Sequence, residues 1–169
     1  MGLTPVNTIF VGKNDMEKVP LFGFMYGKLH ITVDRARLKS KYDTFIKSRT
    51  ALDQGKSLVI YPEGGIYLTE PPHMVRFKDG AFRLAIEKQI PIVPVTIPHN
   101  WIILPPDEFV LHRGKITVIF HEPVETKGLT LENLTELKIR VFNIIDAELK
   151  GTNENRSGTS KKDSPPQQA

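Results

Sequence analysis

The stretch SLVIYPEGG, from Ser57 to Gly65, decides how the rest of the chain is interpreted. Its first five residues are mostly apolar and β-branched or aromatic, which is typical of a buried strand. Pro62 and the two glycines stop that strand abruptly, and a single acid, Glu63, stands at the stop. Because ligands gather at the carboxyl ends of strands in an open α/β sheet, this strand end is where we expect a site.

Strand and helix patterns alternate along the chain. The sequence predicts strands over 7–13, 29–35, 57–61, 90–97 and 115–120, and helices over 40–54, 77–89 and 130–149. Ser40 is the expected cap of the first helix and Gly55 its stop, and the prolines of 90–97 favour an edge strand or a bulge. We therefore expect an α/β domain over residues 1–150, with helices on a largely parallel or mixed sheet, and a disordered polar tail over 151–169.

The composition is that of an ordinary globular domain. The chain has 169 residues, of which 40% are hydrophobic and 25% charged, with no cysteine and a net charge of +4. Without cysteine there is no disulfide, thiolate nucleophile or cysteine metal site. No signal peptide is visible, and no apolar run reaches the ~18 residues that a membrane span needs. Contact with a membrane surface stays open.

Basic groups and glycines follow the predicted strand ends. Arg35 ends the strand over 29–35, Lys78 lies at the start of a helix, and Gly64 and Gly65 offer bare backbone amides. Together they would form a cradle for a phosphate, because a guanidinium, an ammonium and backbone N–H groups all bind phosphate oxygens. Glu63 would then fix the cations or accept a hydroxyl proton. The alternative is a plain strand stop with a solvated acid.

Four motifs carry a family resemblance. GKLHITVDR (27–35), YPEGG (61–65), FKDGAFRLA (77–85) and IPIVPVTI (90–97) resemble, in order and spacing, the 1-acylglycerol-3-phosphate acyltransferase family over about residues 8–125. The resemblance implies a glycerolipid acyltransferase-like α/β fold. It also implies transfer of a fatty acyl group from acyl-CoA or acyl carrier protein to the free hydroxyl of 1-acylglycerol-3-phosphate (lysophosphatidic acid), which gives phosphatidic acid. No cofactor and no metal are expected.

The resemblance also assigns residues. It places the acceptor's glycerol phosphate against Arg35, Glu63, Gly64, Gly65 and Lys78, and the acyl chain against Val93 and Pro94. Gly65 and Ile66 stand where the family has Thr-Arg, so one expected cation is missing. The residues that could replace it are Lys78, Arg76 and Arg37.

The family's catalytic motif, His-x-x-x-x-Asp, is absent from this sequence. An alcohol needs an imidazole to take its proton, and a carboxylate holds that ring in place. Asp34 follows His30 by four residues and Asp79 follows His73 by six, whereas the motif needs five. We assign no catalytic residue in this chain and expect the motif in a segment upstream of Met1.

Other interpretations remain. The chain could be a non-catalytic phosphate- or lipid-binding member of the same fold, or an enzyme acting on a soluble phosphorylated metabolite. A nucleic-acid binder is disfavoured, because the basic residues form no dense stripe. VPLFGFMYG (19–27) is either a core helix or a surface that touches the bilayer or acyl chain. We expect a membrane-associated protein on the cytoplasmic face.

Overall fold

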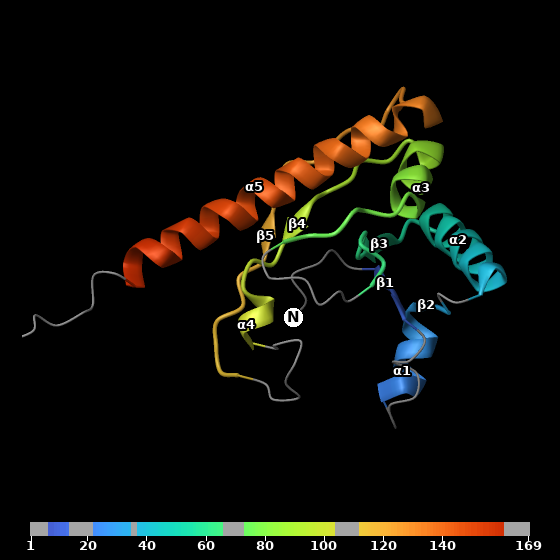
Figure 1. Cartoon of the computed structure of the whole chain (residues 1–169). Coiled ribbons are helices and arrows are strands. Elements are labelled where there is room, and N and C mark those ends of the chain that lie inside the picture. Colours follow the sequence, from blue (N-terminus) through green and yellow to red (C-terminus); the bar gives the residue numbers. More distant parts are fainter. Residues whose placement is uncertain (1–6, 14–21, 35–36, 66–72, 104–111, 161–169) are drawn as a thin grey trace, which may run out of the picture.

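The computed structural model describes residues 7–13, 22–34, 37–65, 73–103 and 112–160 (Figure 1). Strands β1 (Thr8–Lys13), β2 (Ile31–Val33) and β3 (Ser57–Ile60) form a three-stranded parallel sheet in the order β2-β1-β3. Thr8 pairs with Ser57 and Val11 with Ile31. The expected α/β class, with a parallel sheet flanked by helices, is confirmed.

Two helices belong to this sheet. Helix α1 (Phe22–Leu29) precedes β2, and α2 (Leu38–Asp53) connects β2 to β3 and packs against both. Helix α2 ends as expected: Gly55 has φ +73° and donates to the carbonyl of Leu52 at 2.9 Å. The expected cap is wrong, because α2 begins before Ser40. The Ser40 hydroxyl instead accepts a hydrogen bond from the amide of Asp34 at 2.9 Å and so ties α2 to the end of β2.

The segment 19–27, for which the sequence left a core helix and a lipid-contacting surface as alternatives, is only partly described. Residues 14–21 lie outside the described residues, and α1 begins at Phe22. The Phe24 side chain is 69% exposed, with the ammonium of Lys28 4.3 Å from its ring centre. Phe24 is therefore a surface residue and not part of the core.

A short ribbon forms the second sheet. Strands β4 (Val95–Thr96) and β5 (Ile119–Phe120) are antiparallel, and α4 (Asn100–Ile103) follows β4. Both strands are much shorter than the predicted 90–97 and 115–120. Pro91 and Pro94 have no N–H to donate, so upstream of β4 the ladder is reduced to an isolated bridge between Ile92 and Val124. The expected edge or bulge is thus what the structure has.

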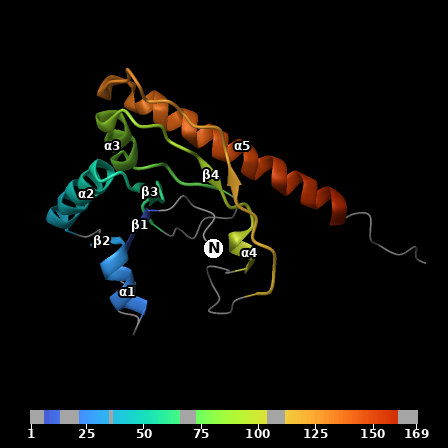
Figure 2. The same ribbon diagram turned by 180° about the vertical axis from the view of Figure 1, so that it is seen from behind.

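A long helix crosses the molecule over α3 and β4 (Figures 1 and 2). A 3-10 turn, η2 (Leu131–Asn133), leads into α5 (Leu134–Ser160), and Thr130 caps it through the amide of Glu132 at 3.3 Å. The helix continues beyond the expected end near residue 149 and includes residues 151–160 of the predicted disordered tail, whereas residues 161–169 lie outside the described residues. Gly151 does not stop the helix, and the Thr152 hydroxyl donates to the carbonyl of Glu148 at 2.7 Å within the continuing turns.

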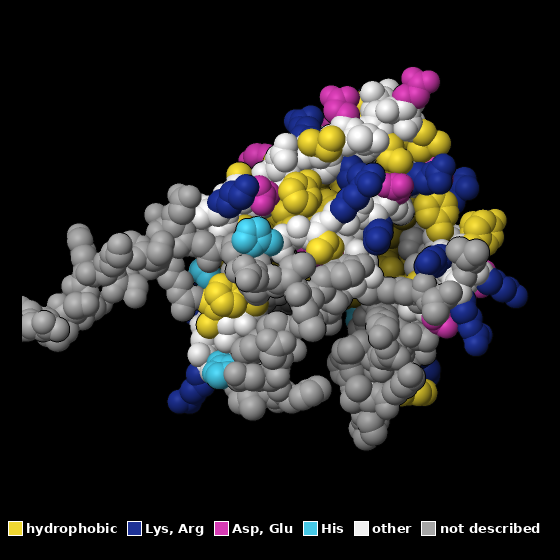
Figure 3. Space-filling model, viewed as in Figure 1, with side chains coloured by type: hydrophobic (Ala, Val, Ile, Leu, Met, Phe, Trp, Pro, Cys, Tyr) yellow, Lys and Arg dark blue, Asp and Glu magenta, His cyan; other side chains and the backbone are white. Residues whose placement is uncertain are grey.

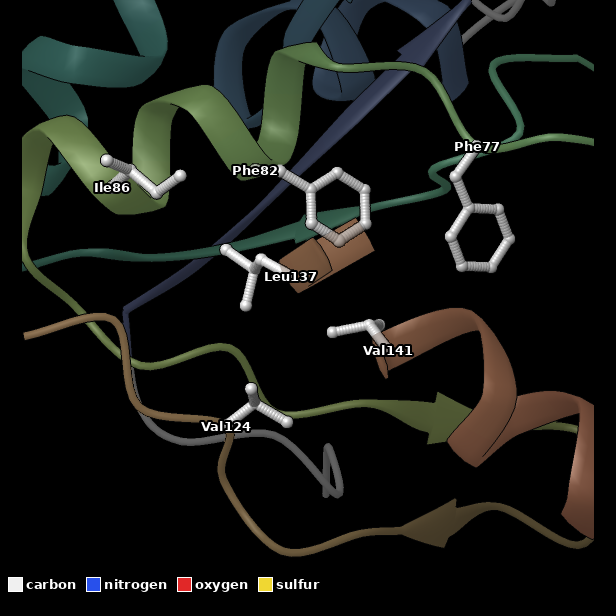
Figure 4. Close-up of a cluster of buried hydrophobic side chains, with 6 residues drawn as sticks. All are labelled: Phe77, Phe82, Ile86, Val124, Leu137 and Val141. Atoms are coloured by element: carbon white, nitrogen blue, oxygen red, sulfur yellow. The ribbon is translucent and has the colours of Figure 1, made fainter. Parts of the chain in front are cut away.

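The core lies between α5 and α3 (Gly80–Lys88). Its buried side chains come from both helices, from the loop before α3 and from the segment after β5, and Figure 4 shows them converging: Phe77, Phe82, Ile86, Val124, Leu137 and Val141. The core therefore fixes the start of α3, which is where the sequence places Lys78.

Candidate functional site

The turn after β3 has the backbone shape that its glycines predict. The amide of Gly64 donates to the carbonyl of Tyr61 at 3.1 Å, and Gly64 has φ +74°, a conformation that favours glycine. The carbonyl of Pro62 accepts a hydrogen bond of 2.7 Å from the amide of Lys78. The strand-end turn and the loop before α3 are thus joined backbone to backbone.

The Lys78 side chain lies across this turn. A Cβ placed on Gly64 would be 3.1 Å from Cγ of Lys78 and 3.8 Å from its Cε. Lys78 is exposed, and among the described residues no carboxylate forms an ion pair with its ammonium. An unpaired cation beside bare backbone is an arrangement that suits an anionic ligand.

Glu63 links the turn to the same loop a second time. Its Oε2 accepts a hydrogen bond from the amide of Val75 at 3.3 Å, and the residue is half-buried. Burial raises the pKa of the Glu63 carboxyl above its ordinary value, and the hydrogen bond from Val75 offsets part of that rise. The solvated-acid alternative therefore does not describe Glu63, which holds the loop that carries Lys78.

Asp79 is the site residue that sequence reasoning missed. It occupies the cap position of α3, but its side chain makes no cap and pairs with Lys138 of α5, Nζ to Oδ1 2.5 Å. That hydrogen bond, and after it the positive charges of Lys138, Arg76 and Arg83, hold the pKa of Asp79 below its usual range. No local pattern of the sequence links Asp79 to Lys138, because the two residues lie 59 positions apart.

The structure brings three of the five predicted acceptor residues together, Glu63, Gly64 and Lys78, and Gly65 follows Gly64 in the chain. Arg35 lies outside the described residues, so its assignment stays a prediction. Of the cations that could replace the missing family arginine, Arg37 pairs with Asp34 at 3.4 Å, and Arg76 is exposed next to the loop residues that contact Gly64 and Glu63. Lys78 is therefore the cation that the geometry places at the turn.

Positive charge is not confined to this turn. Figure 3 shows Lys and Arg side chains spread over the side of the molecule that carries α2. The exposed cations of α2 are Lys39, Lys41, Lys47 and Arg49. Charge alone therefore does not locate a site, and the contact of Lys78 with Gly64 is the more specific observation.

The predicted acyl-chain residues lie elsewhere, in the segment that enters β4. Val93 is 47% exposed, whereas Pro94 is buried and its carbonyl accepts from the amide of His121 at 3.0 Å. A groove of about 270 Å³ between α2 and the parallel sheet is lined by neither residue. The assignment of Val93 and Pro94 to an acyl chain stays a prediction.

Two of the histidines, His30 and His121, contact neighbouring residues of the sheets. The amide of Phe10 donates to Nδ1 of His30 at 3.3 Å, and the two rings meet edge to face with centres 5.2 Å apart. The ring of His121 lies 2.8 Å from the hydroxyl of Thr96. These contacts account for both rings as packed residues of the sheet regions.

Comparison with known proteins gives the same family as the motifs. The family model described as "Acyltransferase" matches residues 1–98. The chain is 31% identical over 139 residues to the 1-acyl-sn-glycerol-3-phosphate acyltransferase of Saccharomyces cerevisiae, covering 81% of this chain and 46% of that protein. It is 27% identical to the enzyme of the same name from Haemophilus influenzae, covering 84% and 58%. The chain belongs to the acyltransferase family.

The fold has a counterpart among solved structures. The crystal structure of the 1-acyl-sn-glycerophosphate (LPA) acyltransferase PlsC from Thermotoga maritima superposes with a TM-score of 0.69 at 22% identity, covering 87% of this chain and 57% of that one. This likeness concerns the fold. The chain spans about half the length of the curated relatives it matches. Within the described part of the chain, no helix combines the length and apolarity that crossing a bilayer requires.

Proposed function

We propose that this chain carries the acceptor-phosphate site of a 1-acylglycerol-3-phosphate acyltransferase, with Lys78 as the main cation for the phosphate. The observation that carries the proposal is the side chain of Lys78, which has no ion-pair partner within the described part of the chain and lies across Gly64 at the carboxyl end of β3. The first turn of α3 follows directly, so the positive end of the helix dipole adds to the charge of Lys78. The names of the curated relatives support this acceptor.

The reaction follows from these partners. The free hydroxyl of the acceptor attacks the thioester carbon of acyl-CoA or acyl carrier protein, a C–O ester bond forms and the C–S bond breaks. The hydroxyl proton ends on the released thiol, and the lipid product is phosphatidic acid. In this scheme Lys78 holds the acceptor phosphate, and Glu63 keeps the loop of Lys78 against the β3 turn through the amide of Val75. Positioning of this kind lowers the activation barrier of acyl transfer, because the translational and rotational entropy of bringing the reactants together is lost on binding and not in the chemical step.

The test is acceptor binding by Lys78→Ala. Loss of a charge-assisted contact of about 1.5–3 kcal/mol should weaken the affinity for 1-acylglycerol-3-phosphate at least about tenfold. The affinity for 1-acylglycerol, which lacks the phosphate, should not change. The control is Lys127→Ala, an exposed lysine on the segment before η2. Equal affinity of Lys78→Ala and the parent would overturn the site. The same measurement on Arg35→Ala tests the assignment that rests on the sequence.

We also infer contact with a lipid surface through α1, because an acceptor with a fatty chain is presented by a bilayer. Phe24, 69% exposed, and Lys28 above its ring form an apolar and cationic pair that suits an anionic interface. The Phe24→Ser variant should sediment less with phosphatidic-acid-containing vesicles than the parent. If Phe24→Ser sediments with the vesicles as the parent does, α1 does not contact the lipid surface.

A further inference from the structure

Helix α5 holds both chain neighbours of Lys78. Phe77 is 3% exposed, and its ring centre lies 5.1 Å from that of Phe142 in an edge-to-face contact. Asp79 pairs with Lys138, Nζ to Oδ1 2.5 Å. Lys138 and Phe142 are four residues apart on α5, so they lie on one face of that helix.

The third attachment comes from the other side of the loop. The amide of Lys78 donates to the carbonyl of Pro62 at 2.7 Å. The backbone of residues 77–79 is therefore held by α5 through two side chains and by the β3 turn through one hydrogen bond. With both neighbours held against α5, the Lys78 side chain is directed to Gly64, where it lies 3.1 Å from the place of a Cβ.

The nature of the Lys138 contact suggests more than stabilisation. The Lys138 side chain is 10% exposed, whereas that of Asp79 is 58% exposed, so a buried ammonium is paired with a partner near solvent. Replacing a buried ion pair by apolar groups is often neutral or stabilising, so such a pair is weak evidence for a stabilising role. A role in holding Asp79 in place explains why α5 has a lysine at position 138, where an apolar residue would otherwise pack.

We propose that Lys138 and Phe142 are positioning residues, which set the affinity for the acceptor phosphate by fixing Lys78 over Gly64. The proposal rests on the proposed function, in which Lys78 binds that phosphate. Both residues lie beyond residues 1–98, the part that the family model matches. In this mechanism α5 controls the site without touching the acceptor.

The experiment is a double-mutant cycle on the full chain. Lys138→Met, Lys78→Ala and the double variant are compared with the parent for binding of 1-hexanoylglycerol-3-phosphate, a short-chain probe. Lys138→Met should weaken binding about five- to tenfold, a coupling of the size found between residues in contact. In the Lys78→Ala background the same change should have no further effect. The matched control is Lys150→Met, which removes an exposed lysine that pairs with Asp146 on the same helix at 2.6 Å and should leave binding unchanged.

A second readout does not depend on the probe. Exchange of the Lys78 amide, protected by Pro62, should speed up in Lys138→Met while the urea midpoint changes little. If Lys138→Met does not fold, Phe142→Leu decides, because it removes the aromatic contact and keeps an apolar side chain. It should also weaken probe binding and speed up the same amide.

The outcomes separate the two proposals. If Lys78→Ala binds the probe as the parent does, the proposed function fails. If Lys78→Ala weakens binding but neither Lys138→Met nor Phe142→Leu does, the positioning role is overturned and the acceptor site stands. If Lys138→Met weakens binding equally with and without Lys78, it acts on the ligand or on the whole fold, and the positioning role is again overturned.

Discussion

The side chain of Lys78 packs on Gly64, with Cγ of the lysine 3.1 Å from the point where a Cβ would stand. A Cβ at position 64 would be closer to Lys78 than ordinary van der Waals contact, so the lysine side chain would have to shift by a few tenths of an ångström. The turn after β3 is therefore the surface on which the Lys78 side chain packs. Glycine is favoured at position 64 for two reasons, its φ of +74° and the close approach of the Lys78 side chain.

Gly64→Ala should therefore impair both folding and acceptor binding. The positive φ alone costs an alanine about 1–2 kcal/mol, and the added methyl group displaces Lys78. Gly55 is a matched control, because it has φ +73° and nothing within 4 Å of its Cβ position. Gly55→Ala should lose similar stability in urea unfolding and keep the parent's affinity for 1-acylglycerol-3-phosphate. Equal affinity of Gly64→Ala and Gly55→Ala for 1-acylglycerol-3-phosphate would show that acceptor binding does not depend on the packing of Lys78 on Gly64.

Glu63→Gln should separate stability from function. Because burial raises the folded-state pKa, the folded chain holds the proton more tightly than the unfolded chain, so the contribution of Glu63 to stability falls as pH rises from 4.5 toward the raised value. Glutamine carries no charge and removes that loss. The variant should be at least as stable as the parent at pH 7, with about tenfold weaker acceptor binding if the charge anchors the headgroup.

Urea unfolding between pH 4 and pH 7 together with binding at pH 7 checks both parts of the Glu63 prediction. If Glu63→Gln binds the acceptor as tightly as the parent does, the charge of Glu63 has no part in acceptor binding. A stability loss at pH 7 in the variant would contradict the burial argument.

The sequence was informative where local patterns decide structure. SLVI predicted β3, Gly55 predicted the end of α2, and the motif order predicted that Gly64 and Lys78 lie close together. Sequence patterns were not sufficient where the structure depends on contacts between residues that lie far apart in the chain. The predicted strands over 90–97 and 115–120 shrink to two residues each, because prolines remove donors from the first and leave the second with little to pair. The Asp79–Lys138 pair joins residues 59 positions apart, which no local pattern reveals.

The core between α3 and α5 should control stability independently of the site. Phe82 is 2% exposed and stacks near Phe77, with ring centres 6.1 Å apart. Phe82→Ala should lower the free energy of unfolding by about 3–5 kcal/mol, because it removes apolar contact and leaves a cavity. Phe120, which is 47% exposed, supplies the control, and Phe120→Ala should cost about 1 kcal/mol or less. Urea midpoints at constant slope measure both, and similar losses would contradict the assignment of the core.

The last prediction concerns turnover. No histidine of the 169 residues has an aspartate at the His-x-x-x-x-Asp spacing, so we expect this chain to bind acceptor and to transfer acyl groups slowly. The deficit relative to a family member with the motif should be about 10²–10⁴-fold, the contribution of general base catalysis. Because the chain has no cysteine, a thiol reagent reads only the CoA released from acyl-CoA in the presence of 1-acylglycerol-3-phosphate. Rapid release that disappears in His30→Ala or His73→Ala would show that the base is one of these residues. Rapid release that both variants retain would place it elsewhere in this chain.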